Sequence, residues 1–516
     1  EALDRAGSLY FTEERFDDFY MGKGSTMPDL HGAIGILFEQ ASSRGHLRDT
    51  RNGTIDFPFT IRNQVTTSFS SLRAAHAHRV ALLDAMRRFY RESRELARSD
   101  RTRALVVAAP HDPARLNAFL RVLAGHRIRA HSLEDTVERD GVRFQAGQAA
   151  VIPMEQTQYR YLKAITEQRT EFEENIFYDV STWSLPLAFD LRFAEMRDRL
   201  PARLIGEPID PFEPLGGTWD QSRSDIGYFV DYRGAYAPRT LSRLLQHDVE
   251  VRVAMESFSP FPEQPALSLP PGSLFIPVTL QPDRADRIHE LLAEARRADA
   301  VSIHSATTGL TPVGIDLGSD NFEPLAMPKI ALLVGSGVST YRSGEVWHLL
   351  DRRFDTPVTL VDSTSASRFP WEDYDTLVLV SGSHRLLPDS FRDELHAWLE
   401  KGNTLVVLDE AVATLIEKEW IDARLRPAGP GEEEANEDEP APPPDRRPYA
   451  RAATDRTLQD VNGAYFQASL DATHPIAFGF TGDTLPVFRT NTDWLEPSPN
   501  PYATPIAYSD EPLLSG

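Results

Sequence analysis

The sequence predicts an α/β protein with two or three doubly wound, flavodoxin-like domains built on parallel sheets. Short apolar segments of strand length alternate with amphipathic helical stretches along most of the chain, and two examples are Ala104–Ala109 and Lys329–Val334. Wholly apolar strands that alternate with helices are typical of parallel sheets covered on both faces. The length of 516 residues is more than one hydrophobic core supports, so three or four domains are expected.

Composition excludes several classes of function. The formal net charge is −23, and no stripe of Lys and Arg stands out, which argues against binding to nucleic-acid phosphates. Cysteine is absent, so disulfides, thiolate metal sites and a cysteine nucleophile are excluded. No apolar run approaches the ~18 residues that a membrane-spanning helix needs. We therefore expect no nucleic-acid partner and no membrane span.

The first hundred residues should form an irregular loop, a strand at Ala33–Phe38 and one long helix that ends near Ser99. Apolar positions three and four residues apart predict the helix, because they share one helical face. These positions are Phe69, Leu72, His76, Val80, Leu83, Met86 and Tyr90. On this reading His76 packs in the core.

After residue 100, a strand–helix–strand pattern occurs three times, beginning at Ala104, Gly227 and Lys329. The repetition is compatible with duplication of one α/β unit, although such units are common. Pro427–Pro448 is acidic and rich in proline, a composition that cannot bury enough apolar surface to fold, so a disordered insertion is expected there. Val461–Pro512 should form short strands and loops that pack on the last domain.

The segment Leu9–His46 carries the residues with the clearest chemical potential. Glu39 ends the predicted apolar strand, and ligands in α/β proteins bind at the carboxyl ends of strands. Upstream, Phe19–Ser25 is a loop with two glycines and the phenol of Tyr20, as is typical of segments that move over a site. Spacing alone makes Glu39 a weak catalytic candidate, because a glutamate at a strand end is more often exposed to solvent.

The amino-acid sequence of this segment resembles the C-terminal part of the catalytic domain in zinc carboxypeptidases of the carboxypeptidase A type. It is most similar to a large bacterial subgroup in which an aromatic loop, here Phe16–Tyr20, precedes Gly-Ala-Ile-Gly and a glutamate. The resemblance covers residues 1–100 and continues more loosely through 329–516. The chain begins at Glu1 without a methionine, so we expect its natural N-terminus to lie upstream.

The resemblance implies the chemistry of the family. Zinc is held by a His-x-x-Glu pair and a later histidine, all upstream of the glutamate and therefore outside this chain. Glu39 matches the glutamate that acts as general base on zinc-bound water and then as acid to the leaving amine. Tyr20 matches the approximate place of the tyrosine that caps the substrate. The implied substrate is a peptide or protein, and the implied location is secreted or periplasmic.

Other metal sites are not favoured by the sequence. His131 and Glu134 fit the His-x-x-Glu spacing, but they follow Glu39 and lie on a predicted strand of another domain. His76 and His78 are two residues apart on a predicted helix, so their imidazoles point in different directions. No metal site is therefore predicted within the chain itself.

Lys329–Leu408 resembles a class I glutamine-amidotransferase-like fold. Active members carry a cysteine on the turn after the strand that here is Thr376–Val380, whereas this chain has Ser381-Gly-Ser-His384. Amidotransferase activity is excluded without a cysteine. A serine hydrolase is not favoured either, because Ser383 lies in an incomplete Gly-x-Ser-x-Gly motif and adjacent residues rarely form a nucleophile–base pair.

Together these features divide the chain into four parts. Residues 1–100 form the end of a carboxypeptidase-like catalytic domain, residues 101–215 and 216–326 are α/β domains, and residues 327–516 are an inactive amidotransferase-like domain with the insertion at 427–448. The first functional hypothesis is a zinc metallocarboxypeptidase whose metal ligands lie outside this chain. The alternative is a non-catalytic scaffold, derived from a peptidase, that binds peptides or cell-wall fragments.

Overall fold

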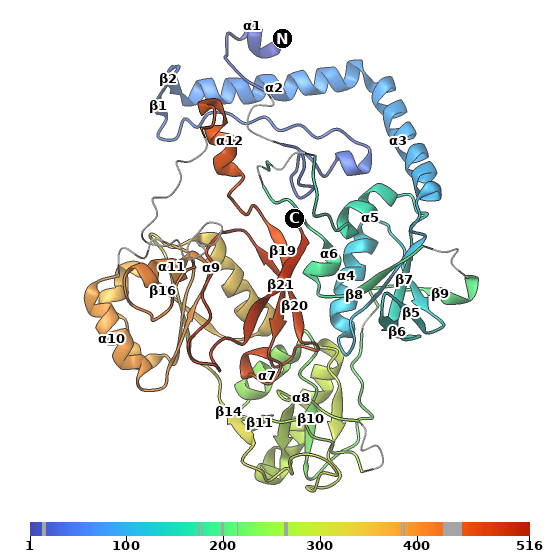
Figure 1. Cartoon of the computed structure of the whole chain (residues 1–516), viewed down its shortest axis with the longest axis vertical. Coiled ribbons are helices and arrows are strands. Elements are labelled where there is room, and N and C mark those ends of the chain that lie inside the picture. The colour runs from blue at the N-terminus through green and yellow to red at the C-terminus, as the bar shows by residue number, and fades with distance from the viewer. Residues whose placement is uncertain are drawn as a thin grey trace.

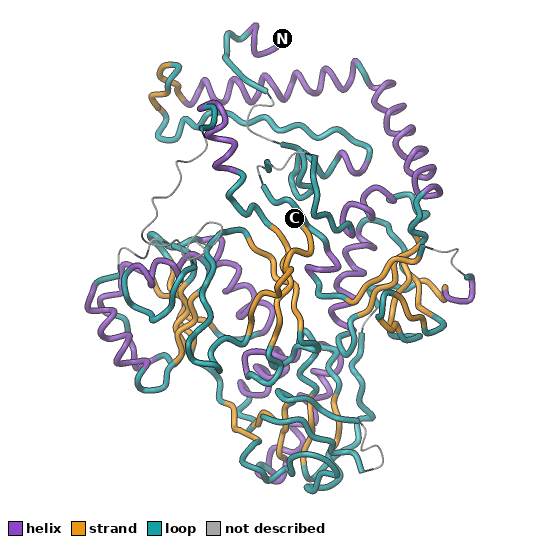
Figure 2. Tube along the Cα trace, viewed as in Figure 1, coloured by secondary structure: helices purple, strands orange, loops and turns teal. Residues whose placement is uncertain are grey.

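The structure of the chain is a computed structural model. It describes residues 1–12, 17–173, 176–177, 179–197, 201–213, 215–262, 267–382, 384, 387–426 and 446–516. The expected insertion at 427–448 lies outside the described residues except for its last three. The described part is a mixed α/β protein with several separate sheets, one of which is parallel. A helical arm crosses the top of the molecule, three sheet-containing modules lie below it, and the C-terminal sheet stands between them (Figures 1 and 2).

The first module after the arm has a five-stranded sheet in the order β8-β3-β7-β4-β9. Its strands are β3 (Ala104–Ala108), β4 (His131–Leu133), β7 (Ala149–Pro153), β8 (Arg192–Met196) and β9 (Ile205–Pro208). Its helices are α4 (Pro113–Gly125), α5 (Tyr159–Thr166) and the short α6 (Leu185–Ala188), and a separate hairpin joins β5 (Val137–Arg139) to β6 (Val142–Phe144). Hydrophobic clusters cover both faces of the five-stranded sheet.

The second module has the same topology. Its sheet order is β13-β10-β12-β11-β14, and its strands are β10 (Gly227–Val230), β11 (Val251–Ala254), β12 (Leu274–Pro277), β13 (Ile303–Ser305) and β14 (Phe322–Leu325). Helix α7 (Ala237–Gln246) joins β10 to β11, and α8 (Ala285–Ala298) joins β12 to β13. Each module is thus a β-α-β-β-α-β unit of the ferredoxin-like type with one added strand.

The parallel sheets expected for residues 101–215 and 216–326 are therefore wrong. Every neighbouring pair in the two five-stranded sheets is antiparallel. The helical crossover does make β10 and β11 run in the same direction, as the apolar pattern indicated. However, β12 lies between them and runs the opposite way, just as β7 lies between β3 and β4. Wholly apolar strands result in either case, because both faces of the sheet are covered.

The last module confirms the parallel prediction. Its sheet has the order β16-β15-β17-β18, with β15 (Ile330–Val334), β16 (Val358–Asp362), β17 (Thr376–Leu379) and β18 (Thr404–Val407) all parallel. Its helices are α9 (Thr340–Trp347), which continues as a π-helix over His348–Arg353, α10 (Asp389–Leu399) and α11 (Glu410–Glu417). They pack with the strands into one hydrophobic core.

The C-terminal region forms a sheet of its own rather than extending the last module. Strands β19 (Ala464–Leu470), β20 (Thr484–Arg489) and β21 (Ile506–Ser515) pair antiparallel in the order β20-β19-β21, after the short helix α12 (Ala452–Thr457). Asn491 donates a hydrogen bond to Asp409 of the last module, and the amide of Gly516 donates to Arg169 in the first ferredoxin-like module. The sheet therefore joins two modules, which Figure 1 shows on either side of it.

The helical arm begins with α1 (Ala2–Arg5) and the hairpin of β1 (Leu47–Thr50) and β2 (Gly53–Asp56). Two helices follow, α2 (Phe57–Ala77) and α3 (Arg79–Ser99), in place of the single predicted helix. The break falls at His78, which leaves the helical conformation at φ −101° and ψ 12°. The predicted end at Ser99 is confirmed. His76 is exposed rather than packed in a core, so that prediction is wrong.

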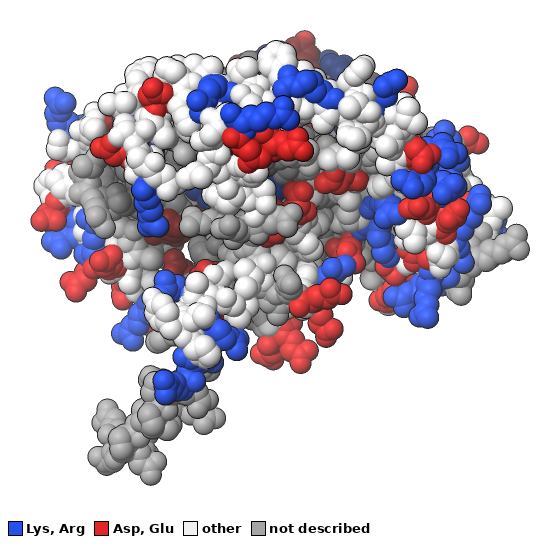
Figure 3. Space-filling model, turned by 90° about the horizontal axis from the view of Figure 1, so that it is seen from above, with Lys and Arg blue, Asp and Glu red and all other residues white. Residues whose placement is uncertain are grey.

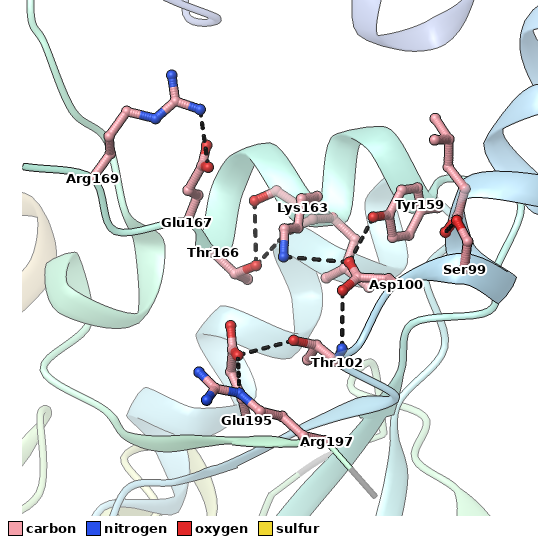
Figure 4. A network of polar contacts seen from close by, with 12 residues as sticks. Ser99, Asp100, Thr102, Tyr159, Lys163, Thr166, Glu167, Arg169, Glu195 and Arg197 are labelled. Carbon is pink, nitrogen blue, oxygen red and sulfur yellow. Dashed lines mark hydrogen bonds and ion pairs between the residues drawn. The ribbon is translucent and has the colours of Figure 1, made fainter. Parts of the chain in front are cut away.

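Asp100 joins the arm to the first ferredoxin-like module (Figure 4). Its carboxylate accepts hydrogen bonds from the Tyr159 hydroxyl at 2.6 Å and the Thr102 amide at 2.9 Å, and it lies 3.3 Å from the ammonium of Lys163. Burial alone would raise the pKa of Asp100, but these hydrogen bonds and the lysine charge outweigh it and lower that pKa. The arm is therefore fixed to the module by a charged, largely buried contact.

Candidate functional site

Glu39 lies in an extended segment that belongs to no sheet. The predicted strand at Ala33–Phe38 is wrong, because residues 34–43 have no regular secondary structure. Among the described residues, the N–H groups of Ile36, Leu37 and Phe38 have no hydrogen-bond partner. A β-strand exists only through pairing with a neighbour, and the part of the chain that the structure describes offers none here. The side chain of Glu39 is exposed.

Polar side chains of α2 nevertheless hold both sides of Glu39 in place. The Gln64 side chain donates a hydrogen bond to the carbonyl of Phe38 at 3.2 Å, and the Asn63 side chain donates to the side-chain oxygen of Gln40 at 2.9 Å. Asn63 is buried and also accepts a hydrogen bond from Ser8 at 2.9 Å. The segment is thus held against α2 on both sides of Glu39, and the Glu39 carboxylate has no hydrogen bond to any described residue.

The turn before this segment is closely packed, and its glycine is required. The amide of Gly35 donates a hydrogen bond to the carboxylate of Asp29 at 3.0 Å. A Cβ atom at Gly35 would lie only 1.5 Å from the carbonyl oxygen of Ser25, so no other residue fits without moving the loop. The Tyr90 hydroxyl of α3 donates to the carbonyl of His31 at 2.9 Å. The loop and the Glu39 segment therefore form one fixed unit.

The loop that carries Tyr20 is docked rather than free. The ring of Phe19 contacts Phe177 and Trp183 with centroid distances of 5.1 and 5.2 Å, and the Tyr20 ring lies 5.7 Å from that of Trp183. A Cβ atom at Gly22 would overlap the Tyr20 ring at 2.3 Å, so the ring covers this glycine. Tyr20 is partly buried in this position. A substrate-capping role would require the loop to leave this position. Phe16 of the aromatic loop lies outside the described residues.

A histidine pair that the sequence analysis missed joins this unit to the first ferredoxin-like module. Nε2 of His31 lies 3.1 Å from Nδ1 of His126, and the His126 ring stacks on Tyr161 with a centroid distance of 4.0 Å. Burial, followed by the charge of His31, lowers the pKa of His126. The two histidines are 95 residues apart in the chain, so no local pattern could reveal the contact.

The described residues include no group of three His, Cys, Asp or Glu side chains placed to hold a metal ion. His131 and Glu134 are not paired as ligands, because His131 contacts the carbonyl of Gly206 and Glu134 accepts a hydrogen bond from Ser132. Nor does any described helix combine the length and apolar character that crossing a membrane requires. Residues of this chain that the structure describes therefore do not fit zinc by themselves.

The carboxyl edge of the parallel sheet in the last module borders a polar cavity of about 400 Å³. The Ser381 hydroxyl donates a hydrogen bond to Asp409 at 2.8 Å, and the Arg342 guanidinium lies 3.0 Å from the same carboxylate. His384 is buried with its Nε2 at 2.7 Å from the carbonyl of Val380, and burial lowers the pKa of its imidazole. The Ser381 hydroxyl is thus hydrogen-bonded to the Asp409 carboxylate and not to the imidazole of His384. Ser383 lies outside the described residues.

No family model, curated protein or solved structure matches the chain.

Proposed function

We propose that this chain contributes Glu39, the proton-transferring carboxylate, to a zinc-carboxypeptidase-like site that hydrolyses C-terminal peptide bonds. The metal ligands would come from polypeptide outside this sequence. The observation that supports the proposal is the state of the Glu39 segment, which is anchored to α2 on both sides of Glu39 but uncovered on its other faces. Such a segment holds a reactive group in a fixed place and leaves room for the remainder of a site.

A carboxylate in this position can accept a proton from the attacking water and later deliver it to the leaving amine. Both steps need the carboxylate to stay near the substrate, and the contacts of the Phe38 carbonyl and the Gln40 side chain hold the segment that carries it. Because the described residues do not fit zinc, no step that involves the metal is assigned to them. Tyr20 remains a proposed substrate contact that depends on movement of its loop.

The alternative, a non-catalytic scaffold that binds peptides or cell-wall fragments, is favoured by one observation. Tyr20 packs against Trp183 and over Gly22, which is the arrangement of a structural residue rather than of a mobile cap. If the scaffold is correct, the complete gene product should bind peptides without hydrolysing them and should hold no zinc.

The decisive experiment is Glu39→Gln in the complete gene product, with zinc content measured in parallel. The substrates are two matched peptides, one with a free C-terminus and one with a blocked C-terminus. We expect the wild type to show carboxypeptidase activity by its kcat on the first and not on the second. The variant should lose about 10²- to 10⁴-fold in kcat with its zinc retained, because it can no longer accept the proton. Glu171→Gln, at another exposed glutamate, is the matched control and should stay within about twofold. Wild-type turnover in the Glu39 variant would refute the assignment.

The 516-residue chain by itself should retain no zinc after dialysis at neutral pH, since its described residues offer no ligand set. Elemental analysis measures this directly. One equivalent of zinc per chain would show that the metal site lies within the chain and not outside it.

A further inference from the structure

The polar cavity of about 400 Å³ at the carboxyl edge of the parallel sheet has no part in the function proposed above. It lies where the strand order reverses, because the chain runs from β15 to β16 on one side and then crosses to β17 on the other side of β15. In open α/β sheets, ligands bind at such a switch point, outside the carboxyl ends of the strands. The volume also falls within the range of ligand pockets, roughly 300–1,000 Å³.

Four segments of the chain line this cavity. Three are the connections that follow β15, β17 and β18, and the fourth follows β20 of the C-terminal sheet. The first two connections are held together, because the amide of Ser339 donates a hydrogen bond to the carbonyl of Ser381 at 2.8 Å. They also approach closely, since a Cβ atom at Gly382 would lie only 2.4 Å from the carbonyl oxygen of Gly337. These contacts fix one wall of the cavity.

Asp409 organises the polar groups of the cavity. Its carboxylate accepts hydrogen bonds from the Ser381 hydroxyl at 2.8 Å and from the Asn491 side chain at 2.7 Å. The same carboxylate lies 3.0 Å from Nε of Arg342. The backbone of Asp409 has φ 58° and ψ −138°, far from the conformations that residues other than glycine prefer. Surrounding contacts must enforce such a conformation, and strain of this kind is frequent at binding sites.

Other polar groups of the lining have bonding capacity that the described residues do not use. The Glu410 carboxylate is exposed and makes no hydrogen bond or ion pair with them. The Ser339 hydroxyl accepts a hydrogen bond from the amide of Arg342 at 3.4 Å but donates none to a described residue. The side-chain amide of Asn491 donates one hydrogen bond and has a second N–H group. The cavity therefore offers both acceptors and donors to a ligand.

A charged ligand fits this lining poorly. Its one cationic side chain among the described residues, Arg342, is already paired with Asp409 at 3.0 Å and with Glu345 at 3.1 Å. The carboxylates of Asp409 and Glu410 repel an anion, and the guanidinium of Arg342 repels a cation. On the face of the molecule that Figure 3 shows, acidic and basic groups are interspersed, so no broad field of one sign is visible there to steer a charged ligand.

We propose that this cavity binds an uncharged, hydroxyl-rich ligand of the size of one or two sugar units. A hydroxyl group both donates and accepts hydrogen bonds, so neighbouring hydroxyls of a sugar can bind the Glu410 carboxylate together with the donors of Ser339 and Asn491. The site is assigned binding and no reaction, because the Ser381 hydroxyl has no hydrogen bond to a histidine.

Binding of small sugars to the 516-residue chain tests the ligand class. N-acetylglucosamine and glucose are the uncharged probes, and glucuronate and protonated glucosamine are matched probes of opposite charge. We expect at least one uncharged sugar to bind with a Kd on the order of 1 mM or tighter, measured by calorimetry or saturation-transfer NMR. Both charged sugars should bind several times more weakly. Equal or tighter binding of a charged sugar, or no detectable binding of any of the four, would overturn the proposal.

Substitution at Glu410 locates the site. Glu410→Ala should weaken binding of the uncharged sugar about 10-fold, because a hydrogen bond to a charged group is lost. Its melting temperature should stay within about 2 °C of the wild-type value, since the side chain is exposed and unpaired among the described residues. Glu417→Ala, at an exposed glutamate at the other end of α11, is the matched control and should change the affinity by less than about twofold. Wild-type affinity in the Glu410 variant would overturn the proposal.

Hydrogen exchange locates the site without a substitution. A bound sugar should slow the exchange of amides at residues 337–342 and 409–412, because it covers the connections that line the cavity. The amides of α4, in the first ferredoxin-like module, should exchange at an unchanged rate. Protection that falls on other modules and spares both lining segments would overturn the proposal.

This inference goes beyond the proposed function and does not depend on it, because Glu39 is not part of the cavity lining. Glu39→Gln should therefore keep the sugar affinity of the wild type, and Glu410→Ala should keep the peptidase activity of the complete gene product. If no sugar binds while Glu39→Gln loses activity, this inference fails and the proposed function stands. If the sugar binds while Glu39→Gln keeps full activity, the proposed function fails and this inference stands.

Discussion

Replacing Asp100 with alanine should loosen the joint between the arm and the first ferredoxin-like module. The change removes the acceptor for two hydrogen bonds, from the Tyr159 hydroxyl and the Thr102 amide, and both donors belong to buried residues. A hydrogen bond to a charged group contributes about 1.5–3 kcal/mol. Lys163 adds little, because its side chain is 37% exposed and regains water. We expect a loss of about 2–4 kcal/mol.

Graded substitutions separate the contributions. Asp100→Asn keeps one side-chain oxygen as an acceptor and should cost about 1 kcal/mol, and Tyr159→Phe should cost about the same. The double variant of Asp100→Ala and Tyr159→Phe should be less destabilised than the sum of the two single changes, since both remove the same 2.6 Å contact. A coupling below about 0.5 kcal/mol would show that this contact is not an important one.

The assay is urea unfolding. Because the modules need not unfold together, the opening of this module is followed by hydrogen exchange of the amides in β3 and α5. The sign of the pH dependence provides a second check. Since the pKa of Asp100 is lowered in the folded chain from its ordinary value of 3.8, its contribution is complete above about pH 4 and disappears as the pH falls through the folded pKa. The difference between wild type and Asp100→Ala should therefore narrow only in that acidic range. A loss under about 1 kcal/mol at pH 7 would refute the reasoning.

Two other perturbations give distinct expectations. Burial lowers the pKa of His126, and the charge of His31 lowers it further. Burial likewise lowers the pKa of His304. The unfolded chain therefore binds protons at these histidines before the folded chain does as the pH falls below about 6.5. The free energy of unfolding should decrease from that pH downwards by up to about 1.4 kcal/mol per pH unit for each histidine. The variant His126→Gln should make this decrease less steep. An unchanged pH dependence in urea titrations would contradict the argument. Deleting Pro427–Pro448 should leave the melting temperature within about 2 °C of the wild-type value, because an acidic, proline-rich stretch is expected to bury little apolar surface. Calorimetry measures this. A larger drop would mean that the stretch is docked.

Local chemistry determined several of the helices and strands of this chain. The apolar run at Ala104–Ala108, the helix that ends at Ser99 and the parallel strands from Ile330 onward follow from patterns within a few residues. The absence of cysteine from the sequence was likewise visible without a structure, and it is the reason to expect no amidotransferase chemistry after Val380. These features depend on side-chain volume, polarity and periodicity, which neighbouring residues carry by themselves.

Only the tertiary structure decided how these elements pair. The direction of β10 and β11 was predictable, but the insertion of β12 between them was not, because the apolar pattern of a strand is the same beside a parallel or an antiparallel neighbour. Likewise Ile34 and Ile36 favoured a strand, but the segment has no pairing partner among the described residues and forms none. Asn63 contacts Gln40, which is 23 positions away in the chain, and His31 contacts His126, which is 95 positions away. Such contacts are set by packing rather than by sequence spacing.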